Sequence, residues 1–298
     1  MTTHHRRAST PLVASALALM AALGTIGLSS TSASAADSSP LQPAFASSDH
    51  PITDVPGLVN ARALGSFVTA SGQTVASSKL IRSESLDKIT PAGASTLATK
   101  YHVELVIDLR TPAQIAAKPD VPVPGAKVVN VSVLGADADY SDDTVMYHDL
   151  ADKGYVSAST PGPTITAYAK VLHLLAKQRH GTVLIHCSHG MDRTGTVVDL
   201  LDHVLGVSRS DTLHDYLLSN TQLGVTWATP ELLQGTFETD VANKYAGLDS
   251  YISKTLRVSH HDLAELRKTY LVAKAAPGDP CHHAKGKHRG ARPGGHAI

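Results

Sequence analysis

The middle of the chain alternates between two patterns of apolar residues. Short runs that predict strands occur at 103–109, 127–133 and 182–185, and the β-branched residues of the first suit a buried strand. Apolar residues at helical spacing occur at 165–175 and 194–205. Because strands alternate with helices, the sequence predicts an α/β fold with a central, mostly parallel sheet flanked by helices.

Further helices are expected on both sides of this region. Thr90 followed by Pro91 predicts a helix start, since the missing N–H of proline costs nothing at the first helical position, and this helix should end near Lys100. From about Pro230 onward the pattern predicts a mostly helical C-terminal part. Residues 136–143, with the sequence ADADYSDD, are expected to form a polar loop.

The N-terminal segments differ in composition from the middle of the chain. Residues 1–35 have a basic start, an uncharged Ala- and Leu-rich run and a final Ala-Ser-Ala. This pattern predicts a cleaved secretory signal peptide, with an uncleaved membrane anchor as the alternative. Residues 36–52 are rich in Ser, Ala and Pro and are expected to be a linker. The protein would then be secreted or held in the cell envelope, with no stable membrane insertion after cleavage.

The C-terminal segment, 277–298, is basic and rich in His, Gly and Pro, so it cannot bury a core and is expected to be disordered. Metal capture by Cys281, His282 and His283, or adhesion to an anionic surface, are the alternative interpretations. One domain, spanning 53–276, remains between the linker and this tail.

The overall composition excludes several classes of protein. Lys plus Arg and Asp plus Glu both number 26, so no excess of positive charge favours nucleic acid as the main partner. The two cysteines, Cys187 and Cys281, are too few for a disulfide framework or a multi-cysteine metal site. The 17 histidines offer no pair at metal-ligand spacing on a clearly predicted helix, so no metal is predicted.

Candidate chemistry gathers in 186–195, HCSHGMDRTG, between a predicted strand and a predicted helix. Six consecutive backbone N–H groups can turn toward one oxyanion there, and the helix start adds positive potential. They belong to Ser188, His189, Gly190, Met191, Asp192 and Arg193. The same field favours a nucleophilic thiolate at Cys187, and the fork of Arg193 can hold two phosphate oxygens. Thr194 could donate its hydroxyl to the departing thiolate. A buried structural cysteine, the alternative, explains neither the arginine nor the glycines.

This loop resembles the HCxxGKDRTG loop of a family of bacterial tyrosine/lipid phosphatases. The likeness extends to 80–90, 105–115, 215–220 and 245–267, and so covers nearly all of 55–272. The resemblance implies a protein-tyrosine-phosphatase-like fold, a phosphocysteine intermediate, and neither a metal nor another cofactor.

Three positions depart from the family pattern. Met191 stands where the family has lysine, which removes a positive charge beside the phosphate. This change is expected to weaken binding of doubly phosphorylated or phosphoinositide-like substrates. Residues 60–66 keep only part of the family's NFRDLGG segment, and Gln114 stands where an acid is expected. The nucleophile and the arginine of the loop are both kept.

Two sets of residues are candidates for the general acid that protonates the leaving oxygen. The resemblance points to Asp192, beside Arg193, and we assign the role to it. The alternative is a mobile upstream loop, and the aspartates of that segment are Asp137, Asp139, Asp142 and Asp143. An ordinary solvated loop is the other interpretation of these four residues.

Supporting residues are expected around the loop. Asp108 and Arg110 end a predicted strand at the carboxyl edge of the sheet, where α/β sites lie. They either support the site or form an internal ion pair. His186 is expected to order the loop by hydrogen bonding, and His189 to face outward, toward substrate.

The sequence therefore predicts a secreted phosphatase that hydrolyses phosphomonoesters through Cys187. A phosphorylated protein, lipid or small phosphate ester would fit a loop that contacts only the phosphoryl group. Two alternatives are a catalytically feeble module that binds phosphorylated ligands, and a rhodanese-like sulfur carrier or arsenate reductase. A disulfide between Cys187 and Cys281 in an oxidising compartment is a further hypothesis.

Overall fold

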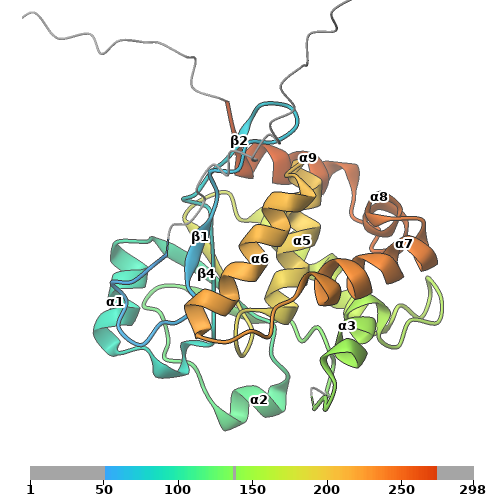
Figure 1. Ribbon diagram of the computed structural model, residues 1–298. Coiled ribbons are helices and arrows are strands. Elements are labelled where there is room, and N and C mark those ends of the chain that lie inside the picture. The colour runs from blue at the N-terminus through green and yellow to red at the C-terminus, as the bar shows by residue number, and fades with distance from the viewer. Residues whose placement is uncertain (1–50, 137–138, 274–298) are drawn as a thin grey trace, which may run out of the picture. The chain divides into compact units, whose positions relative to one another are not determined.

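The computed structural model describes residues 51–136 and 139–273, and Figure 1 shows how their helices and strands are arranged. The strands of the main sheet are, in spatial order, β1 (Arg62–Leu64), β3 (Leu80–Ser83), β6 (Thr182–His186), β4 (Val103–Asp108) and β5 (Lys127–Asn130). Only β1 is antiparallel to its neighbour; the other four strands run parallel. The predicted α/β fold with a mostly parallel sheet is confirmed.

The parallel strands bring their carboxyl ends to one edge of the sheet. In the register, His186 of β6 lies opposite Ser83 of β3 on one side and Asp108 of β4 on the other. Asp108 lies opposite Asn130 of β5 in turn. Because β6 is the central strand, the residue that follows it, Cys187, emerges in the middle of this edge, where α/β proteins place their sites.

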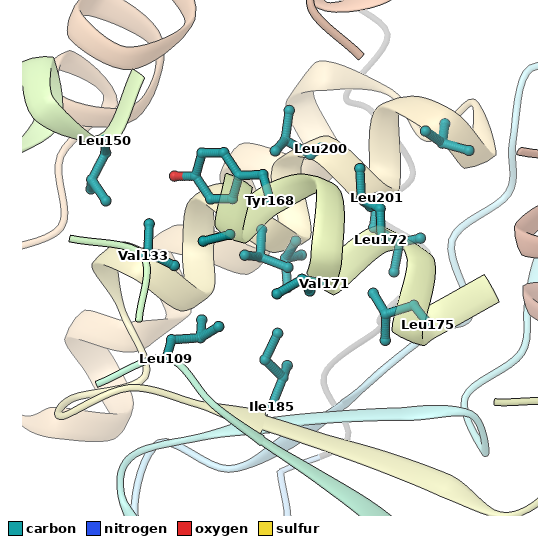
Figure 2. Packing of buried hydrophobic residues seen from close by; sticks show 14 of the residues in the cluster. Leu109, Val133, Leu150, Tyr168, Val171, Leu172, Leu175, Ile185, Leu200 and Leu201 are labelled. Atoms are coloured by element: carbon teal, nitrogen blue, oxygen red, sulfur yellow. The ribbon is translucent and has the colours of Figure 1, made fainter. Parts of the chain in front are cut away.

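Alternate strand residues face opposite sides of the sheet and build two cores. Val183 and Ile185 of β6 belong to a large hydrophobic cluster, whereas Leu184 belongs to a smaller one on the other face. Figure 2 shows Ile185 and Leu109 facing Val171 on a helix of the large cluster. Both faces of the central strand are therefore buried.

Helices cover both cores. Those of the large cluster are α3 (Asp143–Asp152), α4 (Gly162–Lys177), α5 (Asp192–Leu205), α6 (Arg209–Leu223) and α9 (His260–Tyr270). The smaller cluster is covered by α1 (Pro91–Thr99). The short α2 (Pro112–Ala117) has no buried residue, and a two-stranded sheet joins β2 (Thr74–Val75) to β7 (Leu271–Val272).

The helical C-terminal part agrees with the expectation from the sequence, although two of its segments are wound as π-helix. These segments are η2 (Glu231–Glu238) and η3 (Tyr251–Thr255), and α7 (Thr239–Tyr245) and α8 (Leu248–Ser250) lie between them. A 3₁₀ turn, η1 (Leu86–Lys88), follows β3.

Two expectations about local structure need correction. The strand expected over 127–133 ends at Asn130; this strand, β5, is mostly exposed and lies at the edge of the sheet. The end of the expected polar loop, Asp143, already belongs to α3, which the sequence analysis did not predict. That helix starts because the side chain of Asp142 accepts a hydrogen bond from the N–H of Thr144, as a capping residue does.

The first described residues pack against the rest of the domain. Ile52 is buried, and its N–H donates to the carbonyl of Ala61. The predicted signal peptide, nearly all of the predicted linker, and the tail with Cys281, His282 and His283 lie outside the described residues. Within 51–136 and 139–273, no helix combines the length and hydropathy needed to cross a membrane.

Candidate active site

The loop between β6 and α5 is built around Cys187. The cysteine is fully buried, directly after β6, and α5 begins five residues later at Asp192. Gly190 has φ +67°, and a β-carbon there would lie 2.1 Å from the carbonyl oxygen of Ser83. Only glycine can therefore pass this close to β3 in that conformation.

Donors outside the loop bind its carbonyl groups. Arg82 donates from Nη2 to the carbonyl of Gly190 at 2.8 Å, and Asn60 donates from Nδ2 to the carbonyl of His189 at 2.8 Å. The N–H of Ser85 donates to the carbonyl of Ser188 at 3.2 Å. With these carbonyls held from outside, the loop N–H groups and the start of α5 are left to bind an anion.

One carboxylate organises the donors. Asp215 of α6 accepts hydrogen bonds from the guanidinium of Arg62, at 2.7 Å, and from that of Arg82, and all three side chains are buried. Arg62 also donates from Nη1 to the side-chain oxygen of Asn60, at 2.7 Å. Burial opposes ionisation of Asp215, but the two guanidinium groups outweigh it and lower the pKa of the carboxyl. The network thus fixes the loop from behind through one buried carboxylate that pairs with two guanidinium groups.

Arg193, the arginine of the loop, is held by two side chains. Its Nη1 donates to Oε1 of Gln114 at 2.7 Å, and its Nη2 donates to the hydroxyl of Ser188 at 3.2 Å. Gln114 reaches this position because it lies in the first turn of α2, where Thr111 caps the helix. An amide at this point orients the guanidinium without neutralising the charge that would hold a phosphate.

Asp192, the first residue of α5, is buried at the start of the helix. It is 8% exposed, and its Oδ1 accepts a hydrogen bond from the hydroxyl of Tyr147 at 2.9 Å. Burial raises the pKa of Asp192, against the opposing effects of Tyr147 and Arg193. A carboxyl with a raised pKa keeps its proton to higher pH, which suits a proton donor.

The sequence profile of the tyrosine phosphatase family matches residues 53–272. The chain belongs to the tyrosine phosphatase family. Membership places it among phosphoric monoester hydrolases and agrees with the resemblance carried by the HCSHGMDRTG loop.

Individual relatives carry phosphatase names. A tyrosine-protein phosphatase of Nostoc commune is 30% identical over 47% of this chain, and the chain spans only 47% of that relative's length. The triple specificity protein phosphatase PtpB of Mycobacterium tuberculosis is 26% identical over 64% of this chain and 78% of its own length. Among solved structures, PTPMT1 in complex with PI(5)P is 13% identical, covers 56% of this chain and 95% of its own, and superposes with a TM-score of 0.36.

The alternative candidates for the acid that the structure describes, at and just before the start of α3, are more exposed than Asp192. Asp139, Asp142 and Asp143 are exposed, and Asp142 is engaged in capping α3. Asp143 is close enough to raise the pKa of Asp192 by repulsion. Asp137 lies outside the described residues.

Asp108 and Arg110 form the internal ion pair that was one of their two expected roles. Nη2 of Arg110 lies 2.8 Å from Asp108 and 2.7 Å from Asp120, so one guanidinium joins two carboxylates. His186 donates from Nδ1 to the carbonyl of Cys187 at 3.1 Å, and its Nε2 lies 3.3 Å from Asp120. Asp108, Asp120 and His186 have the spacing of a metal site, but Arg110 already supplies the positive charge between the two carboxylates.

The remaining residues of the loop have contrasting environments. His189 is exposed, as expected, whereas Met191 is 3% exposed and packs into the large hydrophobic cluster. Thr194 is fully buried, and its hydroxyl makes no hydrogen bond within the described part of the chain. A cavity of about 280 Å³ adjoins the loop at Ser188 and His189.

Sequence reasoning gave no role to several residues that the fold brings to the site. Trp227 is 48% exposed and packs edge-to-face with His189, with ring centroids 5.4 Å apart. Its position is fixed because the side chain of Asn220 exchanges two hydrogen bonds with the backbone of Ala228. Trp227 is the only tryptophan in the sequence and could have been singled out for that reason, but nothing local in the sequence indicates its distance from the loop.

Proposed function

We propose that this protein is a cysteine-dependent phosphatase that hydrolyses phosphomonoesters through a phosphocysteine intermediate on Cys187. One observation carries the proposal: Cys187 stands between the central strand and the N-terminus of α5, in a loop whose carbonyls are bound from outside. Arg193, held by Gln114, stands on the same loop. This arrangement presents a nucleophile, a ring of N–H donors and a guanidinium fork to one phosphoryl group.

The first step transfers the phosphoryl group to sulfur. The Cys187 thiolate forms a bond to phosphorus, the ester P–O bond breaks, and its electron pair goes to the leaving oxygen. Asp192 gives its proton to that oxygen, and the alcohol or phenol departs. Arg193 and the loop N–H groups balance the negative charge on the phosphoryl oxygens throughout.

The second step restores the enzyme. A water molecule forms a bond to phosphorus and gives a proton to the Asp192 carboxylate. The S–P bond breaks, its electron pair returns to Cys187, and inorganic phosphate leaves. Thr194, whose buried hydroxyl has no partner within the described chain, would donate a hydrogen bond to the sulfur as the thiolate re-forms.

Phosphotyrosine is the substrate that the surroundings of the loop favour, with phosphoserine, phosphothreonine and phosphoinositides as further candidates. His189 and Trp227 supply an aromatic wall beside the loop, against which a phenyl ring can pack. A relative named a triple specificity phosphatase supports a range of substrates. Met191, which is buried, stands where the family has lysine, so the loop lacks that positive charge. We therefore predict weaker binding of doubly phosphorylated ligands.

Secretion is part of the proposal and rests on residues 1–35, with their basic start, apolar run and Ala-Ser-Ala ending. Expression of the full chain in a secreting bacterial host tests it. A product in the medium or envelope that begins at Ala36 supports cleavage, and a full-length product fixed in the membrane contradicts it.

Phosphate release from p-nitrophenyl phosphate tests the activity directly. The chain from Ala36 onward would be assayed with a reductant and a metal chelator, beside its Cys187→Ser and Asp192→Asn variants. Activity that survives chelation and disappears in Cys187→Ser supports the cysteine mechanism. A reduced protein that binds phosphate analogues without releasing phosphate would instead be a phospho-ligand binding module.

A further inference from the structure

Two buried tyrosines form a chain of hydrogen bonds that ends at Asp192. Tyr147 comes from α3 and Tyr216 from α6, and both side chains are almost completely buried. Their hydroxyl oxygens are 2.6 Å apart, and their rings meet edge-to-face with centroids 6.4 Å apart. The chain of contacts ends on Oδ1 of Asp192, 2.9 Å from the hydroxyl of Tyr147.

The direction of these hydrogen bonds follows from counting protons. A phenol has one hydrogen to donate, and the hydroxyl of Tyr147 donates it to Asp192. Tyr216 must therefore donate to the oxygen of Tyr147. Burial raises the pKa of Tyr147 well above its usual value and raises that of Tyr216 as well, so both phenols stay protonated and remain donors.

The bond from Tyr147 distinguishes the two carboxyl oxygens of Asp192. Because Oδ1 accepts from Tyr147, Oδ2 is left as the oxygen that carries the acid proton. Three charged groups also face this carboxyl: Arg193 and His189 favour its ionised form, and Asp143 opposes it. None of the three fixes the rotation of the carboxyl as a hydrogen bond from a buried, rigid phenol does.

The tyrosine pair is itself fixed by the fold. A β-carbon at position 195 would lie 2.9 Å from the ring of Tyr216, so Gly195 is what lets that ring approach α5. Tyr216 also follows Asp215 directly in α6, and Asp215 holds the loop through Arg82. Two neighbouring residues of one helix thus act on Gly190, through Arg82, and on Asp192, through Tyr147.

We infer that Tyr147, held in turn by Tyr216, is a positioning residue that orients Asp192 for proton transfer to the leaving oxygen. The inference rests on the proposed function, because it assumes that Asp192 is the acid of a phosphatase. It assigns roles to two residues outside the phosphate-binding loop, neither of which touches the substrate.

Leaving groups of different basicity separate positioning from general damage. p-Nitrophenolate is a stable anion and leaves with little help from an acid, whereas phenolate needs a proton. Tyr147→Phe should lower kcat/KM for phenyl phosphate roughly ten-fold, with a change of less than about three-fold for p-nitrophenyl phosphate. Since both rates come from one preparation, any loss of folded protein cancels in their ratio.

Tyr168→Phe is the matched control. Tyr168 is also fully buried and its hydroxyl lies 2.7 Å from that of Thr196 on α5, but within the described residues it makes no hydrogen bond to Asp192 or to the loop. It should leave the ratio of the two rates unchanged. Tyr216→Phe, which keeps the ring, should lower the ratio less than Tyr147→Phe.

A pH profile provides a second readout. The bond from Tyr147 lowers the pKa of Asp192, so Tyr147→Phe should move the basic limb of kcat/KM for phenyl phosphate to higher pH. In an Asp192→Asn background, Tyr147→Phe should have no further effect on the ratio.

The outcomes separate this inference from the proposed function. If Tyr147→Phe and Tyr168→Phe change the ratio equally, while Asp192→Asn still slows phenyl phosphate more than p-nitrophenyl phosphate, the role of Tyr147 alone would be overturned. If Asp192→Asn slows both substrates equally, the assignment of Asp192 as the acid would be overturned, and the inference with it. Full activity in Cys187→Ser would overturn the proposed function.

Discussion

Oε1 of Gln114 accepts a hydrogen bond from Nη1 of Arg193 at 2.7 Å, at the position where an acid was expected. The amide therefore holds the guanidinium without pairing with its charge, which the proposed mechanism uses to bind phosphate. The same oxygen also lies 3.3 Å from the N–H of Thr111, so Gln114 closes the capping box of α2.

Gln114→Glu should weaken phosphate binding. Glutamate can keep the capping box, but its carboxylate would compete with the phosphate for Arg193. We expect the inhibition constant of inorganic phosphate to rise roughly ten-fold, or by about 1.4 kcal/mol, at neutral pH. Gln178→Glu, on a half-buried glutamine outside the site, is the control. Unchanged inhibition in Gln114→Glu would show that the contact with Arg193 has no role in binding.

Gly190→Ala should abolish activity and destabilise the protein. The alanine would adopt a left-handed conformation and also place its β-carbon 2.1 Å from the carbonyl oxygen of Ser83. Gly72→Ala is the matched control, since Gly72 has φ +77° but nothing within 4 Å of an added β-carbon. The control should lose about 1–2 kcal/mol of unfolding free energy from its conformation alone and keep its activity. Equal losses in the two variants, measured by urea denaturation, would contradict the predicted clash.

Much of this site could be predicted from the sequence because its parts are contiguous. The loop, its position between strand and helix, and the candidates Cys187 and Arg193 all follow from a local pattern. Asp215 and Tyr147 could not be placed in the same way, because their contacts cross long stretches of chain and depend on how α3 and α6 pack on α5. Likewise, α3 was missed because its start depends on a single capping side chain in an aspartate-rich segment.

Asp215→Asn should destabilise the protein in a pH-dependent manner. The carboxyl has a pKa below its ordinary value of 3.8, so its ionised form stabilises the folded state above that pH and loses this effect as pH falls through the folded-state pKa. At pH 7 the variant leaves Arg62 and Arg82 buried without their carboxylate, at a cost of about 3–5 kcal/mol. Denaturation curves should show this difference shrinking toward pH 3, and a constant difference would contradict the account.

Trp227→Ala should reduce selectivity for aryl substrates. The variant removes the exposed ring that packs edge-to-face on His189, a type of contact worth about 0.5–1.5 kcal/mol. We expect kcat/KM for a phosphotyrosine peptide to fall roughly three- to ten-fold relative to that for a phosphoserine peptide. Trp227→Phe should retain most of the preference. A parallel fall for both peptides in Trp227→Ala would mean that the tryptophan supports the loop instead of binding the substrate ring.

The central claim is that the phosphoryl group passes through the sulfur of Cys187. The most direct measurement is intact-protein and peptide mass spectrometry after rapid acid quenching of the reduced enzyme during turnover of p-nitrophenyl phosphate. The account predicts a phosphoryl adduct on the peptide that contains Cys187, and its absence in Cys187→Ser. Turnover with no adduct on that peptide, or with undiminished activity in Cys187→Ser, would contradict it.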